Sequence, residues 1–351
     1  MGFTDIEYDI YNKYGKNPIS CLAGTAEKSR FALKDGHGFI SYSEYGSLAL
    51  VLGEPVCASE RIRGAVQEFR EFCRSNQWHE IYFSTLGDSE AGFPKIEYRK
   101  IYLGEEALIP LPVLRHKKSV RRMIRKAQKE GIVMQELSGG RFAHEEFWKG
   151  CGEITDCWLR EKGNNLISFM INNRFLDCQA HQRSFIAMRK GHAVGFAIAY
   201  EVPAASAMYV DVTRIGPGAP NGTSELMVDA LSKIATARGF RHLSLGMAPL
   251  SNLEKDTANQ SFLKIIFSML YEYGGWLYPS KSELSFKRKF MPLWRPVYAY
   301  CSKEAGFLDF YNMFRIFQPL SLRENFLMRF FGVKPEAGDG TLQKGKNHGF
   351  G

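Results

Sequence analysis

Asp211 and Arg214 lie three residues apart in "MYVDVTRI", and their side chains suit proton transfer and anion binding. Apolar and polar residues alternate here, so the segment is expected to be a strand with Tyr209, Asp211 and Thr213 on one face. A carboxylate can accept the proton of an attacking hydroxyl or orient an ammonium, and a guanidinium can hold a phosphate through two hydrogen bonds. An Asp–Arg ion pair at the end of a strand is the structural alternative.

A loop rich in glycine and proline, "GPGAPNG", follows directly and leads into a helix that begins near Thr223. Gly218 and Gly222 have no Cβ, so their backbone N–H groups can approach another molecule closely. The helix N-terminus adds unpaired donors and a partial positive charge. Together these features favour a site for a phosphate or an oxyanion. A tight turn capped by Thr223 or Asn221 explains the same residues structurally.

A second small-residue stretch, "LSLGMAPLS", ends the following strand and contains Gly246. Ligands of open α/β sheets bind outside the carboxyl ends of strands. We therefore expect the two glycine-containing stretches to frame one crevice, in which main-chain donors and the Asp211 carboxylate meet a ligand.

The segment "RHKKSVRRMIRKAQKEG" predicts a helix with a strongly cationic side. Its apolar stripe is Val120, Met123, Ile124 and Ala127. Helical spacing aligns Lys118, Arg122, Arg125 and Lys129, and the cationic ridge is widened by Lys117, Arg121 and Lys126. Stacked like charges destabilise a helix, which favours a phosphate-bearing partner, first a tRNA acceptor arm and second lipid headgroups. A plain solvated face is the alternative.

The order of predicted elements indicates an α/β protein. One unit contains a hairpin at 36–56, a helix at 59–78 with Ser59 as N-cap and strands at 80–86 and 100–111. Residues 113–150 are expected to be mostly helical. A second unit contains a helix at 153–163, strands at 183–191, 193–202 and 205–215, a helix at 224–238, a strand at 240–250, a helix at 259–274 and a strand-like segment ending near residue 300.

Composition places the chain among globular proteins with an anionic partner. It has 351 residues, 45% hydrophobic and 24% charged, with a formal net charge of +9. Seven scattered cysteines without a CxxC pair indicate reduced thiols and no metal site. No apolar run approaches about 18 residues, and the N-terminus does not resemble a secretory signal.

The C-terminal part of the sequence divides into two segments. Residues Phe307–Lys334 combine many aromatic side chains with arginine, which is typical of an interfacial membrane anchor. A helix pair docked on the core and a dimer contact are the alternatives. The segment from Pro335 is polar and glycine-rich, so we expect it to be disordered.

The combination "DVTR…APNGTSELMVDAL…LGMAPLS…FKRKF" closely resembles the C-terminal catalytic domain of phosphatidylglycerol lysyltransferases, the bacterial multiple peptide resistance factors. The resemblance covers about residues 20–300. It implies two tandem GCN5-related N-acetyltransferase-like domains, each a mixed β-sheet flanked by helices. It also implies transfer of an amino acid from aminoacyl-tRNA to a glycerol hydroxyl of a phosphatidylglycerol-like phospholipid, without a cofactor or a metal.

The resemblance assigns expected roles to individual residues. The expected catalytic group consists of Asp211, Arg214 and Glu225. At position 225 the family commonly has aspartate. The substrate-binding group consists of Asn221, Gly222, Thr223, Gly246, Ser251, Lys287 and Lys289. The group expected to bind tRNA phosphates consists of Lys118, Arg121, Arg122, Arg125 and Lys129. Two positions depart from the family pattern, because Gly275 replaces an acidic residue and Leu284 replaces an arginine.

The resemblance also sets the expected organisation. We expect an N-terminal acyltransferase-like domain at 1–114, a basic helical connector at 115–150, a catalytic acyltransferase-like domain at 151–303, an aromatic and basic helical extension at 304–334 and a tail at 335–351. The family's flippase domain has no counterpart in the sequence. We therefore expect a stand-alone cytoplasmic enzyme that associates peripherally with the inner face of an anionic membrane. A coenzyme-A-dependent N-acyltransferase and an inactive tRNA- or membrane-binding member are the alternatives.

Overall fold

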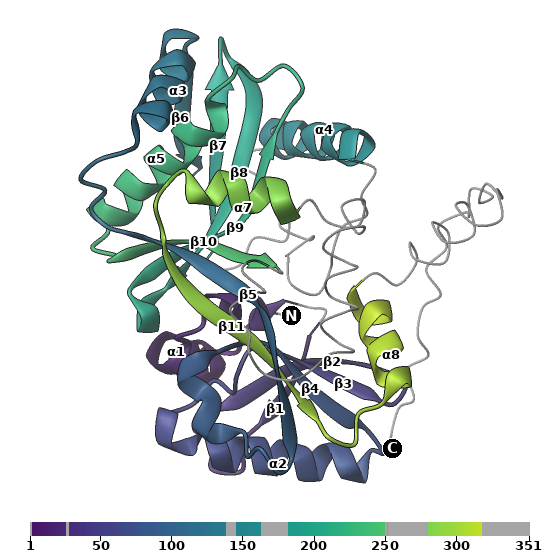
Figure 1. Ribbon diagram of the computed structural model, residues 1–351. Helices are drawn as coiled ribbons and strands as arrows, with labels where there is room; N and C mark the ends of the chain where they lie inside the picture. Colours follow the sequence, from purple (N-terminus) through teal and green to yellow (C-terminus); the bar gives the residue numbers. More distant parts are fainter. Residues whose placement is uncertain are drawn as a thin grey trace, which may run out of the picture.

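The computed structural model describes residues 2–25, 28–137, 145–162, 182–249, 251 and 280–317. In this part of the chain eleven strands form one sheet, in the order β1-β2-β3-β4-β11-β5-β10-β9-β8-β7-β6. The neighbours β3 and β4 are parallel, as are β9 and β10. Helices lie on both faces of the sheet (Figure 1). The protein is therefore a mixed α/β fold built on one large mixed sheet, in agreement with the expected class.

The first part of the chain forms one end of the sheet. Its strands are β1 (Ser29–Ala32), β2 (Phe39–Tyr45), β3 (Leu48–Leu52) and β4 (His79–Leu86). Its helices are α1 (Asp5–Tyr14), the 3-10 helix η1 (Pro18–Gly24), η2 (Ser59–Arg61), α2 (Ile62–Ser75) and η3 (Gly87–Gly92). The expected hairpin is formed by β2 and β3. The expected helix is α2, and its apolar stripe, Ile62, Val66, Phe69 and Cys73, is buried.

The later part of the chain forms the other end. Its strands are β6 (Ile132–Leu137), β7 (Gln182–Arg189), β8 (His192–Val202), β9 (Ala207–Ile215) and β10 (His242–Pro249). Its helices are α3 (Lys118–Lys129), α4 (Glu145–Lys162), η6 (Pro203–Ala205), α5 (Thr223–Ala237) and α7 (Ser280–Arg288). The strands expected at 183–191, 193–202, 205–215 and 240–250 are confirmed.

Two long strands connect the ends of the sheet. β5 (Tyr98–Pro110) pairs with β10 on one side and with β11 (Leu293–Ser302) on the other. β11 also pairs with β4, so it lies between two strands that come from the first third of the chain. Figure 1 shows β5 and β11 running side by side through the middle of the molecule. The division into domains at 114 and 151 stays a prediction.

Three clusters of buried side chains hold the layers together. The first lies under η1 and extends along both ends of the sheet, with Leu50 and Ile81 from one end and Phe196 and Ile198 from the other. The second packs α3 and α5 against the later strands, and the third packs α2 against β2 and β4. Because the first cluster is continuous across the junction, η1 seals the middle of the sheet on that face.

Some expectations need correction. Residues 113–150 are not mostly helical, because Ile132–Leu137 forms β6 at the edge of the sheet, paired with β7. Ser59 does not cap α2, because it is the first residue of η2 and Arg61 is the N-cap of α2; the Ser59 hydroxyl accepts a hydrogen bond from Lys16 Nζ (3.2 Å). α8 (Phe307–Phe317) forms the start of the aromatic segment. The helix expected at 259–274, the rest of that segment and the tail lie outside the described residues.

Candidate functional site

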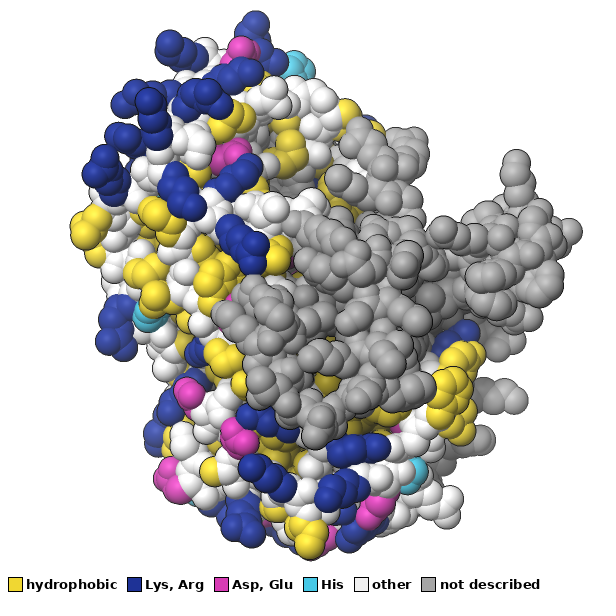
Figure 2. All heavy atoms as spheres, viewed as in Figure 1, with side chains coloured by type: hydrophobic (Ala, Val, Ile, Leu, Met, Phe, Trp, Pro, Cys, Tyr) yellow, Lys and Arg dark blue, Asp and Glu magenta, His cyan; other side chains and the backbone are white. Residues whose placement is uncertain are grey.

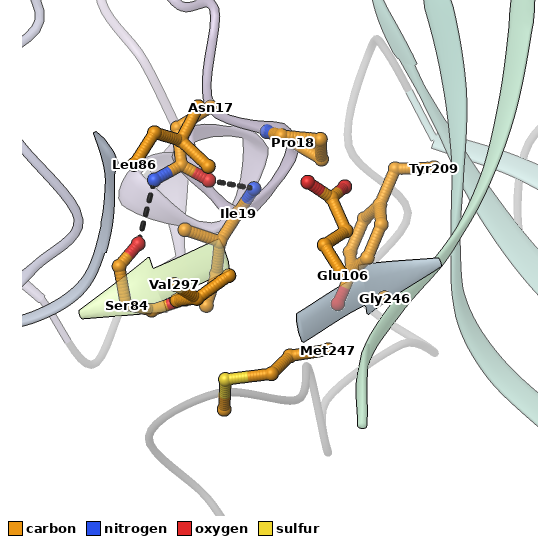
Figure 3. Close-up of a pocket in the computed structure, with 10 residues that line it drawn as sticks. All are labelled: Asn17, Pro18, Ile19, Ser84, Leu86, Glu106, Tyr209, Gly246, Met247 and Val297. Atoms are coloured by element: carbon orange, nitrogen blue, oxygen red, sulfur yellow. Dashed lines mark hydrogen bonds between the residues drawn. The ribbon is translucent and has the colours of Figure 1, made fainter. Parts of the chain in front are cut away.

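A small cavity lies in the middle of the sheet, where the strands from the first part of the chain meet those from the later part. Five adjacent strands and the start of η1 line it. Its lining residues are Asn17, Pro18, Ile19, Ser84, Leu86, Glu106, Tyr209, Gly246, Met247 and Val297 (Figure 3). Its volume is about 20 Å³, room for about one water molecule. It is therefore a small recess lined by both polar and apolar side chains.

The backbone around this cavity departs from regular strand geometry. Ser84 and Gly246 both line it and have positive φ angles of 67° and 74°. A register shift between Ser244 and Met247 marks a bulge where β10 pairs with β5. β11 shows further register shifts against both β4 and β5. Bulges and left-handed residues are costly and concentrate where a fold must aim side chains at a site.

Glu106 provides a buried negative charge at this cavity. Its carboxylate accepts a hydrogen bond from Ser244 Oγ at 2.6 Å and two from Arg295, at 3.0 Å and 2.6 Å. The residue is only 4% exposed. In Figure 3 the carboxylate points from β5 towards Pro18, beside the ring of Tyr209. Two charge-assisted donors thus hold it in one orientation inside the recess.

A second buried carboxylate, Glu54, lies behind the cavity wall. Asn17 Nδ2 donates to Glu54 Oε2 (2.8 Å) and to the Ser84 carbonyl (2.7 Å), and the Leu86 N–H also donates to Glu54 Oε2 (3.2 Å). Burial raises the pKa of Glu54, although these hydrogen bonds and the charge of Arg295 oppose the rise. Glu54 therefore links η1 to β4 at the cost of burying a carboxylate.

Asp211 lies in a β-bulge of β9, two residues after Tyr209. Val210 and Val212 pair with the neighbouring residues Ala199 and Ile198 of β8, so Asp211 is the extra residue. Burial raises the pKa of the Cys21 thiol in η1, and the negative charge of Asp211 adds to the rise. The Asp211 carboxylate is therefore close to η1, on the side of the sheet that carries the cavity.

The bulge changes which residues share a face of β9. Val212 packs in the first core cluster together with Tyr209, and Arg214 follows on the same side. Thr213, which is exposed, turns to the other face, so the expectation that it shares a face with Tyr209 is wrong. Regular alternation fails here because the bulge adds one residue to the strand.

Arg214 is buried between β9 and α4. Its Nη1 donates to Thr155 Oγ1 at 2.7 Å, and its guanidinium lies 5.4 Å from the centre of the Trp158 ring. Burial lowers the pKa of Arg214 to about 10, and the charge of Asp211 opposes that change. The expected proximity of Asp211 and Arg214 is thus present as an electrostatic interaction, with Trp158 stacked near the cation.

Gly222 uses its missing side chain for packing between helices. It is the N-cap of α5 with a φ of 98°, and a Cβ placed there would lie 2.1 Å from the Met123 carbonyl oxygen of α3. Gly222 is not among the residues that line the cavity, whereas Gly246 is. Of the two glycine-containing stretches, only the one with Gly246 therefore contributes to this cavity, and the common crevice that the sequence suggests stays a prediction.

The neighbours of Gly222 close the turn into α5. Thr223 Oγ1 donates to the Pro220 carbonyl at 2.7 Å, and Asn221 is exposed. Glu225, in the first turn of α5, is buried and pairs with Lys289 Nζ at 2.8 Å. A negative charge is favourable at this end of a helix. The expected site residues Glu225 and Lys289 are thus brought together, and they join α5 to the end of α7.

Lys287 connects α7 to the cavity wall. It is buried, and its ammonium donates to the carbonyls of Gly246 (3.3 Å) and Met247 (2.7 Å) and pairs with Glu283 (2.5 Å). Ser251 is fully buried. Its hydroxyl donates to the Ala248 carbonyl (2.8 Å) and accepts from the Glu105 N–H (3.1 Å). Both residues therefore hold the bulged end of β10 in place.

The expected cationic ridge lies on the surface. Val120, Ile124 and Ala127 are buried against α5 and the later strands. All seven cations of the ridge are exposed, and five of them form the group expected to bind tRNA phosphates: Lys118, Arg121, Arg122, Arg125 and Lys129. Lys and Arg side chains gather over α3 at the upper left of Figure 2. No ion pair joins these five residues to another described residue, so their charge is directed to solvent.

The sequence reading missed the residues that define the cavity. Glu105 and Glu106 are two acids in the middle of an otherwise apolar strand, and such acids are rarely buried without a partner. That placement was a usable signal. The sequence gives no signal that Asn17 and Ser84 line the cavity, because their positions depend on how η1 packs against the sheet.

Two general findings concern the described residues. No group of three or more histidine, cysteine, aspartate or glutamate side chains is arranged there to hold a metal ion. None of the helices in the same residues combines the length and the apolar composition that a bilayer span requires.

Solved structures share this fold. The C-terminal domain of a putative lysylphosphatidylglycerol synthetase from Agrobacterium fabrum superposes with a TM-score of 0.74 at 20% identity, covering 89% of this chain and 96% of that one. L-PGS from Bacillus licheniformis superposes with a TM-score of 0.73 at 21% identity, covering 90% of this chain and 97% of that one. At these identities the likeness shows a common fold.

Sequence relationships extend over the same region. A phosphatidylglycerol lysyltransferase of Staphylococcus epidermidis is 23% identical over 303 residues, which cover 82% of this chain and 34% of the relative. The chain thus spans about a third of the length of such relatives. The family model described as "Phosphatidylglycerol lysyltransferase, C-terminal" matches residues 8–301. With the fold and most of its length accounted for, the chain belongs to the family of phosphatidylglycerol lysyltransferase C-terminal domains.

Proposed function

We propose that the protein transfers an amino acid from aminoacyl-tRNA to a hydroxyl of a phospholipid such as phosphatidylglycerol. The observation that carries the proposal is the family match over residues 8–301, which includes the cavity and the bulge at Asp211. Several of the relatives that match are named phosphatidylglycerol lysyltransferase. We expect no metal or cofactor to take part, because the aminoacyl ester is already activated.

The reaction exchanges one ester for another. The lipid hydroxyl attacks the aminoacyl carbonyl carbon, a new carbon–oxygen bond forms, and the bond to the tRNA ribose oxygen breaks. The hydroxyl proton passes to a base and then to the departing ribose oxygen. The enzyme must therefore position two large substrates, accept one proton and stabilise one developing negative charge.

Asp211 is the proposed base. It is the extra residue of the bulge in β9, two residues after Tyr209 of the recess, and its charge acts on Cys21 of η1. Arg214 lies three residues further on, and its positive charge interacts with the charge of Asp211. Glu225 completes the proposed catalytic group at the start of α5, paired with Lys289.

Substrate binding is assigned to residues on two sides of β10. Gly246, Ser251 and Lys287 hold or line the cavity wall. The remaining members of this proposed group stand at the start of α5 and the end of α7: Asn221, Gly222, Thr223 and Lys289. The tRNA acceptor arm is assigned to the exposed cations of α3, because phosphate contacts supply most nucleic-acid affinity. We further propose that the enzyme works as a peripheral protein at the inner membrane face.

The test is direct formation of an aminolipid. Purified protein is incubated with aminoacyl-tRNA, radiolabelled in the amino acid, and phosphatidylglycerol vesicles, and lipid extracts are separated and analysed by mass spectrometry. Label in a lipid of the mass of an aminoacyl ester supports the proposal. Binding of both substrates without labelled lipid would instead identify an inactive member. Acetyl transfer from acetyl-coenzyme A to an amine would identify an N-acyltransferase.

A further inference from the structure

Three large apolar side chains are exposed in two adjacent segments next to the cationic helix α3. Leu114 is 92% exposed in the segment before α3, Leu293 is 57% exposed at the start of β11, and Met291 is 50% exposed between α7 and β11. The ring of His116 lies 6.3 Å from that of Phe290, and Lys117 Nζ donates to the Arg288 carbonyl at 3.3 Å. These contacts bring the two segments next to each other, and we call the three residues the apolar patch.

The backbone under the patch directs it outwards. Met291 has a φ of 52°, which is unusual for a residue with a side chain, and Phe290 before it is buried. The turn therefore anchors Phe290 in the core and turns Met291 to solvent. A strained position that exposes a large apolar side chain has a cost in stability, and such costs are usually retained for a function.

The charges around the patch are almost all positive. Arg115, Lys117, Arg241 and Arg288 are exposed in the segments that form or adjoin it. Three described acids of the adjoining α5 and α7 are already paired: Asp229 with His116 and Lys233, Glu225 with Lys289, and Glu283 with Lys287. Figure 2 shows hydrophobic side chains exposed directly below the Lys and Arg that gather over α3.

We propose that the apolar patch and its surrounding cations dock on the surface of an anionic phospholipid bilayer. A bilayer interface accepts apolar side chains into its acyl boundary while headgroup phosphates attract the cations. An RNA backbone matches the cations but offers nothing to exposed leucine and methionine. The choice of a bilayer rests on the proposed function, in which the acceptor is a membrane lipid.

Docking here would bring the membrane close to the cavity. Lys287, at the end of α7, donates to the carbonyls of Gly246 and Met247 in the cavity wall. Met291 follows four residues later, after a single turn. The same short segment therefore links the bilayer contact to the proposed site of chemistry.

The test measures vesicle binding without any tRNA. A triple variant, Leu114→Ser with Met291→Ser and Leu293→Ser, is compared with Ile96→Ser, which removes a residue that is 80% exposed. Ile96 and Leu114 lie beyond opposite ends of β5, whose 13 residues span about 40 Å. Partition onto phosphatidylglycerol-containing vesicles is expected to fall at least about tenfold in the triple variant and to stay unchanged in Ile96→Ser. Thermal melting checks that both variants are folded.

Further measurements separate the outcomes. Lys117→Glu with Arg288→Glu is expected to weaken binding to anionic vesicles and to leave the weak binding to phosphatidylcholine vesicles unchanged. A folded triple variant that binds vesicles like the wild type overturns the proposal. A loss of tRNA binding in the triple variant as large as its loss of vesicle binding also overturns the proposal, because it would assign the patch to RNA. Patch-dependent vesicle binding without aminolipid formation would support the docking surface while contradicting the proposed function.

Discussion

Glu106 and Arg295 face each other as cross-strand partners of β5 and β11, with Arg295 Nη2 2.6 Å from Glu106 Oε2. This pair joins a strand from the first third of the chain to one from its last sixth, at the wall of the cavity. Its carboxylate is almost fully buried and its guanidinium is about a quarter exposed. The pair therefore orders the site and fixes the register of the two central strands.

Removing Arg295 alone should lower the free energy of unfolding more than removing the charges of both Arg295 and Glu106. Arg295→Met leaves the Glu106 carboxylate buried without its cation, which we expect to lower the free energy of unfolding by about 3 kcal/mol. Arg295→Met combined with Glu106→Gln removes the charge too and should recover most of that loss. Urea denaturation of the two variants measures the difference. A double variant no more stable than Arg295→Met would contradict this account.

Asp211 should be required for transfer and not for RNA binding. We expect Asp211→Ala and Asp211→Asn each to lower aminolipid formation by at least about a hundredfold, because the base is lost. Binding of aminoacyl-tRNA should not change, since Asp211 is remote from the α3 surface. Thr213→Ala, an exposed neighbour on the opposite face of β9, is the control. Full transfer by Asp211→Asn would remove Asp211 from the mechanism.

Charge reversal on α3 should weaken RNA binding and should make the remaining binding less dependent on salt. Arg122→Glu with Arg125→Glu is expected to lower tRNA affinity at least about tenfold and to reduce the slope of log affinity against log salt by about 1.5. The matched control reverses two exposed cations elsewhere, Arg63 and Lys95, to glutamate. Fluorescence anisotropy over a salt series measures both quantities. Equal losses in the two double variants would indicate nonspecific attraction alone.

Gly222→Ala should destabilise the protein far more than Gly218→Ala in the same loop. At Gly222 a Cβ would lie 2.1 Å from the Met123 carbonyl oxygen and φ is 98°, whereas nothing lies within 4 Å of a Cβ at Gly218. The left-handed conformation costs about 1–2 kcal/mol, and displacing α3 costs about 1–3 kcal/mol more. Thermal melting of both variants measures the contrast. Similar melting temperatures would mean that α3 does not press on α5.

Glu54 should make stability depend on pH with a predictable sign. Its pKa is raised by burial above the ordinary 4.5, so the folded state holds the proton more tightly than the unfolded chain. Stability is therefore gained as pH falls through the raised value towards 4.5. Glu54→Gln avoids the buried charge and should be at least as stable as the wild type at pH 8, with its advantage vanishing near pH 4.5. Exposed Glu44→Gln, measured by the same denaturation series, should show no such trend.

Much of the fold was predictable because its elements carry local signals. The apolar stripe from Ile62 to Cys73 and the buried face of α3 follow from helical spacing alone. β6 was not predicted, although Gly131 before it and Gly139 and Gly140 after it are turn signals, because the short segment was included in the helical stretch that follows the basic helix. The insertion of β11 between β4 and β5 has no local signal, since pairing partners about two hundred residues apart are chosen by tertiary packing.

The site was predictable only in part, for a different reason. Gly246 and Lys287 were named from motifs, and the structure places them in contact. Gly222 was expected at a ligand and lies against α3, because a missing Cβ permits close approach without saying to what. The bulge at Asp211 could not be predicted, because apolar and polar residues still appear to alternate in "MYVDVTRI" although Asp211 is an inserted residue.

The position of β11 has a consequence for how the chain reaches its native state. Until β11 is available, β4 and β5 lack the neighbour that satisfies their backbone hydrogen bonds, and two unpaired edges face water. During synthesis β4 and β5 can pair with β11 only after residues near 300 have been made, so we expect folding to be slow and to depend on distant contacts. We therefore expect an isolated fragment that ends before β11 to bind chaperones and to aggregate.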